Sequence, residues 1–100
     1  MIQKEFEKHV DQLMEMMKQT LVKKGNDYSK EDRLSNFKEV GAISGTSAEL
    51  ACLTLIATKV SRLGTLLRKC GIPNNESIED SAIDLANYAV ILHAIISEKK

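Results

Sequence analysis

The chain has no tryptophan, and aromatic residues make up only 4% of it, so aliphatic side chains and methionine must fill its core. Neither sign of charge is in excess, because the formal net charge is zero. The basic field that a nucleic-acid polymer requires is therefore missing, although a small anionic ligand needs only a few placed cations. Uninterrupted apolar runs, such as residues 89–92, are far too short to span a membrane.

A secretion signal and a structural zinc site are not indicated either. Charged residues from Glu5 to Asp11 interrupt the apolar segment that a signal peptide needs. Cys52 and Cys70 have the wrong number and spacing for a zinc site, and both fall at apolar helix positions, which predicts buried free thiols. We therefore expect a cytoplasmic protein with no membrane and no nucleic-acid polymer as partner, and with no cofactor.

Helical periodicity is what the chain has in abundance. Its 100 residues, 43% of them hydrophobic, fit a single helical domain over residues 1–100. We expect an all-α fold, a small helical bundle with three main helices plus a short helix in the 32–41 region. Because so small a domain buries a limited share of its surface, we also expect a homo-oligomer.

Spacing and capping signals predict where the first two helices lie. The first is expected over residues 3–24, and its apolar stripe consists of Ile2, Phe6, Val10, Leu13, Met17 and Leu21. Two lysines before Gly25 predict its end, since cations favour the negative end of the helix dipole and glycine favours the left-handed cap. Asp32 is expected to cap the short helix, and Gly41 and Gly45 are expected to interrupt the chain after it.

Two longer helices follow. Residues 46–49 (TSAE) predict the start of the third helix as a capping box, and Gly71 predicts its end. Its expected core face consists of Cys52, Leu53, Ile56, Val60, Leu63, Leu67 and Cys70. The last helix is expected over residues 77–98, with a second capping box at residues 77–80 (SIED).

The last helix carries two polar faces, although a surface helix needs only one. At about 100° per residue, its ordinary solvent face consists of Glu79, His93 and Ser97. A second polar stripe lies between two apolar faces and consists of Asp80, Asp84, Asn87 and Tyr88. Partly buried carboxylates need cations, donors, metal or ligand. Lys59 and Arg62, at the border of the preceding helix's core face, are the expected counter-charges.

The polar stripe has two interpretations. In the structural one, Asp80 belongs to the capping box, Asp84 forms an ion pair with Lys59 or Arg62, and Tyr88 is a core aromatic. In the functional one, the stripe lines a ligand site together with a loop. Because an aromatic beside an arginine suits a base and a phosphate, that loop would contribute Asp27, Tyr28, Arg33, Asn36 and Phe37.

Five short blocks occur in order along the chain: residues 24–28 (KGNDY), 32–37 (DRLSNF), 59–63 (KVSRL), 75–80 (NESIED) and 84–88 (DLANY). Together they resemble the small phage and prophage family called nucleotide modification associated domain 1, over roughly residues 24–95. The resemblance implies a link to nucleotide metabolism or DNA modification, without an established catalytic mechanism. It also implies one site that contains Asp27, Tyr28, Asn36, Phe37, Lys59, Arg62, Asp80, Asp84, Asn87 and Tyr88.

Three functions stay open for this site. The first is binding of a nucleotide or nucleotide-derived signal, which a phage protein would sequester from host defence, with Lys59 and Arg62 on phosphate. The second is a magnesium-dependent hydrolase similar to the all-α nucleoside triphosphate pyrophosphatases, with Asp80 and Asp84 as ligands, although their paired E-x-x-E helix is missing. The third is an interaction module whose polar stripe pairs with its copy. The chain has no recognisable nucleophile–base pair, which favours binding.

Overall fold

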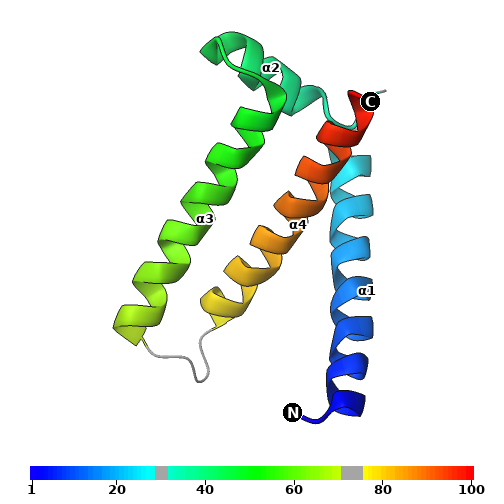
Figure 1. Cartoon of the computed structure of the whole chain (residues 1–100), viewed down its shortest axis with the longest axis vertical. Coiled ribbons are helices and arrows are strands. Elements are labelled where there is room, and N and C mark those ends of the chain that lie inside the picture. Colours follow the sequence, from blue (N-terminus) through cyan, green and yellow to red (C-terminus); the bar gives the residue numbers. More distant parts are fainter. Residues whose placement is uncertain (29–31, 71–75) are drawn as a thin grey trace. The chain divides into compact units, whose positions relative to one another are not determined.

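The structure, a computed structural model, describes residues 1–28, 32–70 and 76–100, with backbone alone for residues 23–28, 70, 76 and 77. Within these residues it contains four helices and no strand. They are α1 (Gln3–Tyr28), α2 (Ser35–Ser44), α3 (Ala48–Cys70) and α4 (Glu76–Glu98), as Figure 1 shows. The expected all-α fold of three main helices and one short helix is confirmed.

The chain divides into two compact units, Met1–Arg33 and Leu34–Lys100. The first unit contains α1, and the second contains α2, α3 and α4. The second unit holds the core and the whole polar stripe, so it is the unit that bears on function. A single domain over residues 1–100 stays a prediction.

Helix α1 begins at Gln3 as expected, but it does not stop at the lysine pair and Gly25. It continues to Tyr28. A glycine inside a helix costs only about 1 kcal/mol relative to alanine, and no proline follows it, so the helix passes through. The expected apolar stripe is half-buried from Val10 to Leu21 and exposed at Ile2 and Phe6.

Helix α2 begins at Ser35, later than the Asp32 cap predicted, and its N-cap residue is Leu34, which makes no side-chain cap hydrogen bond. The buried side chain of Leu34 packs in the core, so packing rather than a cap fixes this start. Gly45 ends the helix in the left-handed conformation, with a φ of 71°, as expected of a glycine cap.

Gly41 does not interrupt the chain as predicted, because it lies inside α2 and is buried. A Cβ at this position would lie 2.6 Å from the carbonyl oxygen of Ser47 and 2.8 Å from the amide nitrogen of Ala48. The glycine therefore lets α2 lie directly against the backbone at the start of α3. Sequence alone could not distinguish this close approach from a helix break.

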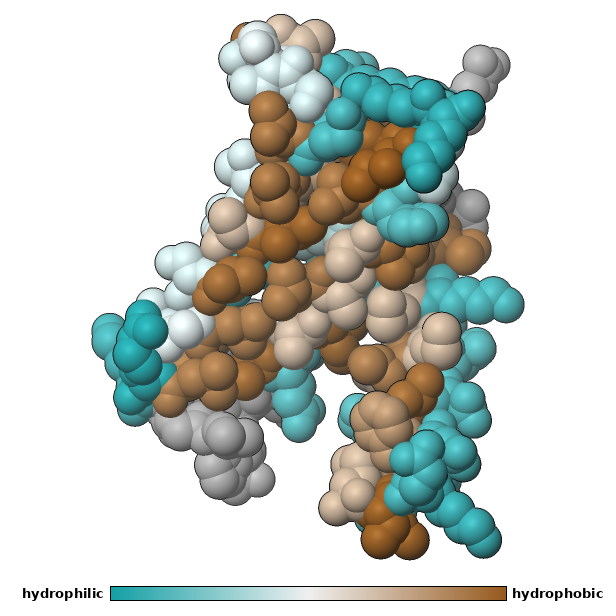
Figure 2. Space-filling model, viewed as in Figure 1, coloured by the Kyte–Doolittle hydropathy of each residue, from teal (hydrophilic) through white to brown (hydrophobic). Residues whose placement is uncertain are grey.

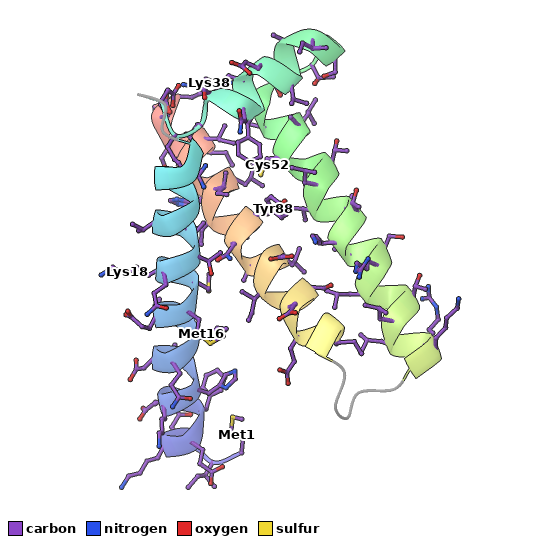
Figure 3. The ribbon with its side chains drawn as sticks, turned by 180° about the vertical axis from the view of Figure 1, so that it is seen from behind. Met1, Met16, Lys18, Lys38, Cys52 and Tyr88 are labelled. Carbon is purple, nitrogen blue, oxygen red and sulfur yellow. The ribbon has the colours of Figure 1, made fainter. Side chains whose placement is uncertain are left out.

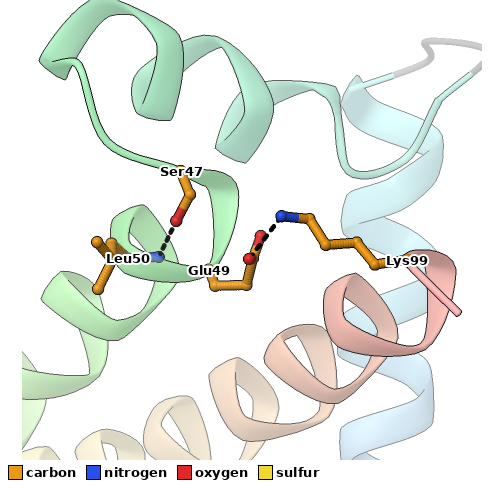
Figure 4. A network of polar contacts seen from close by, with 4 residues as sticks. All are labelled: Ser47, Glu49, Leu50 and Lys99. Atoms are coloured by element: carbon orange, nitrogen blue, oxygen red, sulfur yellow. Dashed lines mark hydrogen bonds and ion pairs between the residues drawn. The ribbon is translucent and has the colours of Figure 1, made fainter.

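The cap of α3 is one residue later than predicted. Ser47 Oγ accepts a hydrogen bond of 3.2 Å from the Leu50 amide, whereas the predicted capping hydroxyl was that of Thr46 (Figure 4). Glu49 does not close the predicted box. Its Oε2 accepts a hydrogen bond of 2.7 Å from Lys99 Nζ, which ties the start of α3 to the residues just after α4 (Figure 4).

Helices α3 and α4 pack antiparallel. Contacts join Glu49 to Lys99, Cys52 to the carbonyl of Tyr88, and Lys59 to Asp84, so the residue number falls on α4 as it rises on α3. Figure 3 shows Cys52 and Tyr88 in the space between the two helices. The core there is a cluster of Leu34, Cys52 and Ile95, against which pack Phe37, Ala48, Ile56, Tyr88, Ile91 and Leu92.

The expected core face of α3 is only partly covered. Cys52 is buried as predicted, and Ile56 and Leu63 are half-buried. In contrast, Leu53, Val60 and Leu67 are 48%, 53% and 45% exposed. The apolar residues of α3 spread over more than one side of the helix, and α4 covers only the side that contains Cys52, Ile56 and Lys59. The side chain of Cys70 lies outside the described residues.

One helix of the described residues, over Ala48–Lys69, is long and apolar enough to cross a membrane by length and composition, with 11% of the tested window buried. A single helix of this kind is a weak indication of a span. Lys59 and Arg62 lie near its middle, and a charge at the centre of a bilayer costs about 3 kcal/mol on insertion scales.

The Glu49–Lys99 ion pair makes the free energy of unfolding depend on pH in the acid range. The hydrogen bond from Lys99, followed by a backbone hydrogen bond at Glu49 itself, lowers the pKa of the Glu49 carboxyl from its ordinary value. A carboxyl whose pKa is lowered by folding stabilises the protein above its unfolded pKa, about 4.3, and loses that contribution as pH falls through the folded pKa. We expect thermal melts between pH 7 and 3 to show a smaller acid-side fall in Tm for Glu49→Gln than for wild type.

Lys99→Ala serves as the reciprocal variant, because it removes the donor and leaves the carboxyl in place. It is expected to flatten the same part of the pH profile. Profiles for both variants that run parallel to that of the wild type would contradict the assignment.

Candidate functional site

The polar stripe of α4 is the face that packs against α3. Asp84 contacts Lys59, and the Tyr88 carbonyl accepts a 3.4 Å hydrogen bond from the Cys52 thiol. Ile91 and Ile95 continue the same line of α4 into the core. The stripe therefore forms one helix–helix contact that is polar in the first half of α4 and apolar in the second half.

The Lys59–Asp84 ion pair occupies the middle of this contact. Lys59 Nζ lies 2.9 Å from Asp84 Oδ2, and the two side chains are 26% and 36% exposed. Lys59 reaches α4 because it follows Cys52 and Ile56 on one side of α3, at the spacing of four and three that keeps residues on one helix face. An ion pair of this exposure contributes on the order of 1 kcal/mol or less. The structural interpretation of Asp84 therefore matches what the structure contains.

Two further charges lie beside this pair, at the solvent edge. Arg62 is three residues after Lys59 on α3, and Asp80 is four residues before Asp84 on α4. Because the helices are antiparallel, both residues lie on the side of the ion pair that faces away from the core. Both side chains are exposed, and within the described residues neither forms an ion pair or a side-chain hydrogen bond. They remain able to contact a ligand.

Asn87 is the residue of the polar stripe whose buried side-chain oxygen lacks a hydrogen-bond partner in the described residues. It is only 6% exposed, and its buried Oδ1 has no hydrogen-bond donor among the residues that the structure describes. Leaving a buried acceptor unpaired costs about 1–3 kcal/mol. Asn87 follows Asp84 by three residues, so it lies on the next turn of α4, next to the ion pair.

The aromatic members of the predicted site have a packing role. Phe37 and Tyr88 are half-buried and pack against the cluster of Leu34, Cys52 and Ile95. They join α2 and α4 to the core, which leaves their rings less free to stack on a ligand. Asn36, the neighbour of Phe37 on α2, is exposed.

The remaining predicted residues come from the first part of the chain. The side chains of Asp27 and Tyr28 lie outside the described residues. Arg33 is half-buried and belongs to the unit Met1–Arg33, whereas the stripe belongs to the other unit. The structure thus brings together Lys59, Asp84, Asn87 and Tyr88, with Arg62 and Asp80 beside them.

One polar residue of this contact was not predicted. Ser81 is 3% exposed on α4, and it precedes Asp84 by three residues, so both share one helix face. That spacing is the signal that would have assigned Ser81 to the stripe.

Reactive and metal-binding groups are also few in this region. Burial raises the pKa of the Cys52 thiol, which keeps it protonated and unreactive at neutral pH. In the described part of the chain, no three side chains of His, Cys, Asp or Glu gather where they would hold a metal ion. Under the hydrolase alternative, magnesium would be held by Asp80 and Asp84, and Lys59 already pairs with one oxygen of Asp84.

Comparison with protein-family models, with curated proteins and with solved structures finds no match to this chain. The resemblance to the nucleotide modification associated domain 1 family therefore stays a prediction based on five blocks of sequence.

Proposed function

We propose that the chain binds a small nucleotide-like ligand, without hydrolysing it, at the edge of the α3–α4 contact. The observation that carries the proposal is Asn87, whose Oδ1 is buried without a hydrogen-bond donor in the described residues. Because this oxygen is buried, a ligand reaches it only when the side chains over it move aside, and a hydrogen bond donated to it then removes the cost of leaving it unpaired. Arg62 lies on the facing helix, and its exposed guanidinium carries the positive charge that a phosphate needs, whereas Lys59 is paired with Asp84.

Asn87 suits the base of a nucleotide, and Arg62 suits its phosphate. An asparagine amide pairs with the amino group and ring nitrogen of adenine, and a lone amide oxygen accepts from any exocyclic base amine. Arg62 has an exposed guanidinium, which binds phosphate oxygens in a bidentate manner. Asp80, also exposed, is an acceptor for a ribose hydroxyl.

The biological setting rests on the sequence blocks alone. A small phage-type protein that binds a nucleotide-derived signal without turnover would sequester that signal from host defence. In that setting tight binding matters and catalysis is not needed, in keeping with the protonated thiol of Cys52 and the ion-paired carboxylate of Asp84.

Isothermal titration calorimetry against mononucleotides, di- and triphosphates and cyclic mono- and dinucleotides tests the proposal. We expect one class to bind to the wild type. Arg62→Ala is expected to weaken that binding about tenfold or more, which corresponds to about 1.4 kcal/mol. Asn87→Leu is expected to abolish binding and yet leave the free energy of unfolding unchanged or higher, because it removes a buried acceptor without a partner.

Lys69→Ala is the matched control, since Lys69 is an exposed cation in the last turn of α3. It is expected to keep the affinity of the wild type. The proposal fails if no nucleotide binds, or if Asn87→Leu binds as the wild type does. Release of product in the presence of magnesium or manganese would replace it with the hydrolase alternative.

A further inference from the structure

An apolar stripe that neither α2 nor α4 covers runs along α3, about 100° around the helix from the side that faces α4. Its large members are half exposed, Leu50 and Val60 at 50% and 53% among them. Figure 2 shows hydrophobic side chains along the length of α3 on the face that it draws. We call this set the α3 stripe, and it consists of Leu50, Leu53, Ala57, Val60, Gly64 and Leu67.

The α3 stripe has the spacing of a helix–helix seam. Its members follow one another at alternating intervals of three and four residues, which is the heptad a/d pattern. The stripe covers 17 residue steps, or about 26 Å at 1.5 Å per residue. An apolar strip this narrow and straight fits another helix better than a flat or irregular surface.

Gly64 has no role that the chain itself explains. The atoms nearest to a Cβ built at this position belong to the flexible side chain of Arg68, the first of them 3.3 Å away, and the helix there is regular. Glycine is a poorer helix former than every residue except proline. Its presence on the stripe, where it is half-buried, is explained if a second backbone or a large side chain comes close at this point.

The stripe is complementary to itself when two copies run antiparallel. In the register that places Ala57 opposite Val60 of the other copy, Leu53 faces Gly64 and Leu50 faces Leu67. Large residues then face small ones at the centre, which is the alternation that fills a helix–helix interface. A parallel arrangement would instead place Leu53 opposite Leu53 and Gly64 opposite Gly64, so that large residues face large ones.

Charge favours the same direction. Helix α3 has Glu49 in its first turn and Arg68 and Lys69 in its last turn. Glu49 is already paired with Lys99 of its own chain, so the direction is decided by the basic ends, which parallel copies would bring together and antiparallel copies keep apart. The helix dipoles also oppose each other in the antiparallel arrangement.

The threonines that flank the stripe do not oppose this contact, whereas the flexible guanidinium of Arg68 lies over Gly64 and must move aside. Thr54 lies on its outer side, and the Thr54 hydroxyl donates to the Leu50 carbonyl at 2.9 Å. Thr58 and Thr65 make the same bond to the carbonyl four residues earlier, at 3.0 and 3.1 Å. Because these hydroxyls are satisfied within the helix, a partner need not provide polar groups for them.

We propose that the α3 stripe is the interface of an antiparallel homodimer, in which Leu53 of one copy packs on Gly64 of the other. A lipid bilayer is the competing occupant, and it is disfavoured by the two charges, Lys59 and Arg62, near the middle of the helix. The dimer does not rest on the proposed nucleotide site, since Arg62 and Asn87 are not part of the stripe.

Analytical ultracentrifugation of the full chain from 1 to 100 μM tests the oligomer. The wild type is expected to be dimeric in this range. Val60→Glu is expected to raise the dissociation constant at least 100-fold, and Gly64→Leu at least tenfold, while circular dichroism shows unchanged helix content. Leu55→Glu makes the same kind of change on α3 outside the stripe, where Leu55 is 39% exposed, and is expected to change the constant less than threefold.

Disulfide trapping tests the direction of the two helices. In a Cys70→Ser background, a mixture of Leu53→Cys and Gly64→Cys proteins is expected to form a cross-linked heterodimer on mild oxidation, and neither protein alone is expected to cross-link efficiently. A monomeric wild type at 100 μM overturns the proposal, and so does dissociation by Leu55→Glu without dissociation by Val60→Glu. Self-cross-linking of each variant alone overturns the antiparallel direction, and flotation of a monomeric wild type with phosphatidylcholine–phosphatidylglycerol vesicles overturns the dimer in favour of lipid.

Discussion

Replacing Ile95 by alanine is expected to lower the free energy of unfolding by about 3 kcal/mol. Ile95 is 2% exposed and forms the buried cluster with Leu34 and Cys52. Truncation removes apolar atoms from the cluster to which α2, α3 and α4 all contribute side chains, and it leaves a cavity. Because three separate elements line that cavity, it cannot close by moving a single side chain. Urea unfolding followed by circular dichroism measures the loss.

The control for this prediction is Ile43→Ala, which removes the same atoms from an isoleucine of α2 that is 87% exposed. A surface substitution of this kind is expected to stay within about 0.5 kcal/mol of the wild type. Equal losses for the two variants would show that the cluster around Ile95 is not the core of the second unit.

Gly41→Ala is expected to destabilise the protein by about 2 kcal/mol, although alanine is the better helix former by about 1 kcal/mol. The new Cβ would lie 2.6 Å from the Ser47 carbonyl oxygen and 2.8 Å from the Ala48 amide nitrogen. These are backbone atoms, so the clash is relieved only by moving α2 away from the start of α3, which is the kind of overpacking that costs 1–3 kcal/mol or more. The expected fall in Tm is about 10 °C.

Ala42→Ser provides the comparison for Gly41→Ala, since Ala42 is the next residue of α2 and is exposed. Its Tm is expected to stay close to that of the wild type. A Tm for Gly41→Ala above that of the wild type would mean that helix propensity, and not the contact with α3, decides the effect at this position.

Gly41 and Ser47 show how far the sequence predicts the fold. Periodicity predicts all four helices, because their apolar residues recur at helical spacing over long stretches. Boundaries are less certain, since they depend on contacts that lie far apart in the sequence. Gly41 looks like a helix stop until α3 is known to lie against it, and Ser47 displaces Thr46 as the cap only because of where the chain turns after Gly45.

The candidate site was also predictable only in part from the sequence. A helical wheel identifies the polar stripe and predicts Lys59 or Arg62 as the partner of Asp84, and the structure contains the ion pair with Lys59. The wheel does not show that Asn87 is buried with an acceptor without a donor in the described residues, because burial depends on the neighbouring element. Nor does it show which apolar side of α3 is covered, so it predicts a core position for Val60, which α4 does not reach.

The position of the buried cluster has a consequence for local opening. Leu34, Cys52 and Ile95 lie where α2 meets the start of α3 and the end of α4, whereas Lys59 and Asp84 lie further along the pair and remain partly exposed. Regions with fewer buried apolar contacts open at lower free energy. The two ends of the same helix pair therefore differ in how often their amide protons meet water, with the ion-paired half exchanging faster. A ligand bound beside the Lys59–Asp84 ion pair would slow amide hydrogen exchange in that half of the helix pair, because that half opens more often in the free protein.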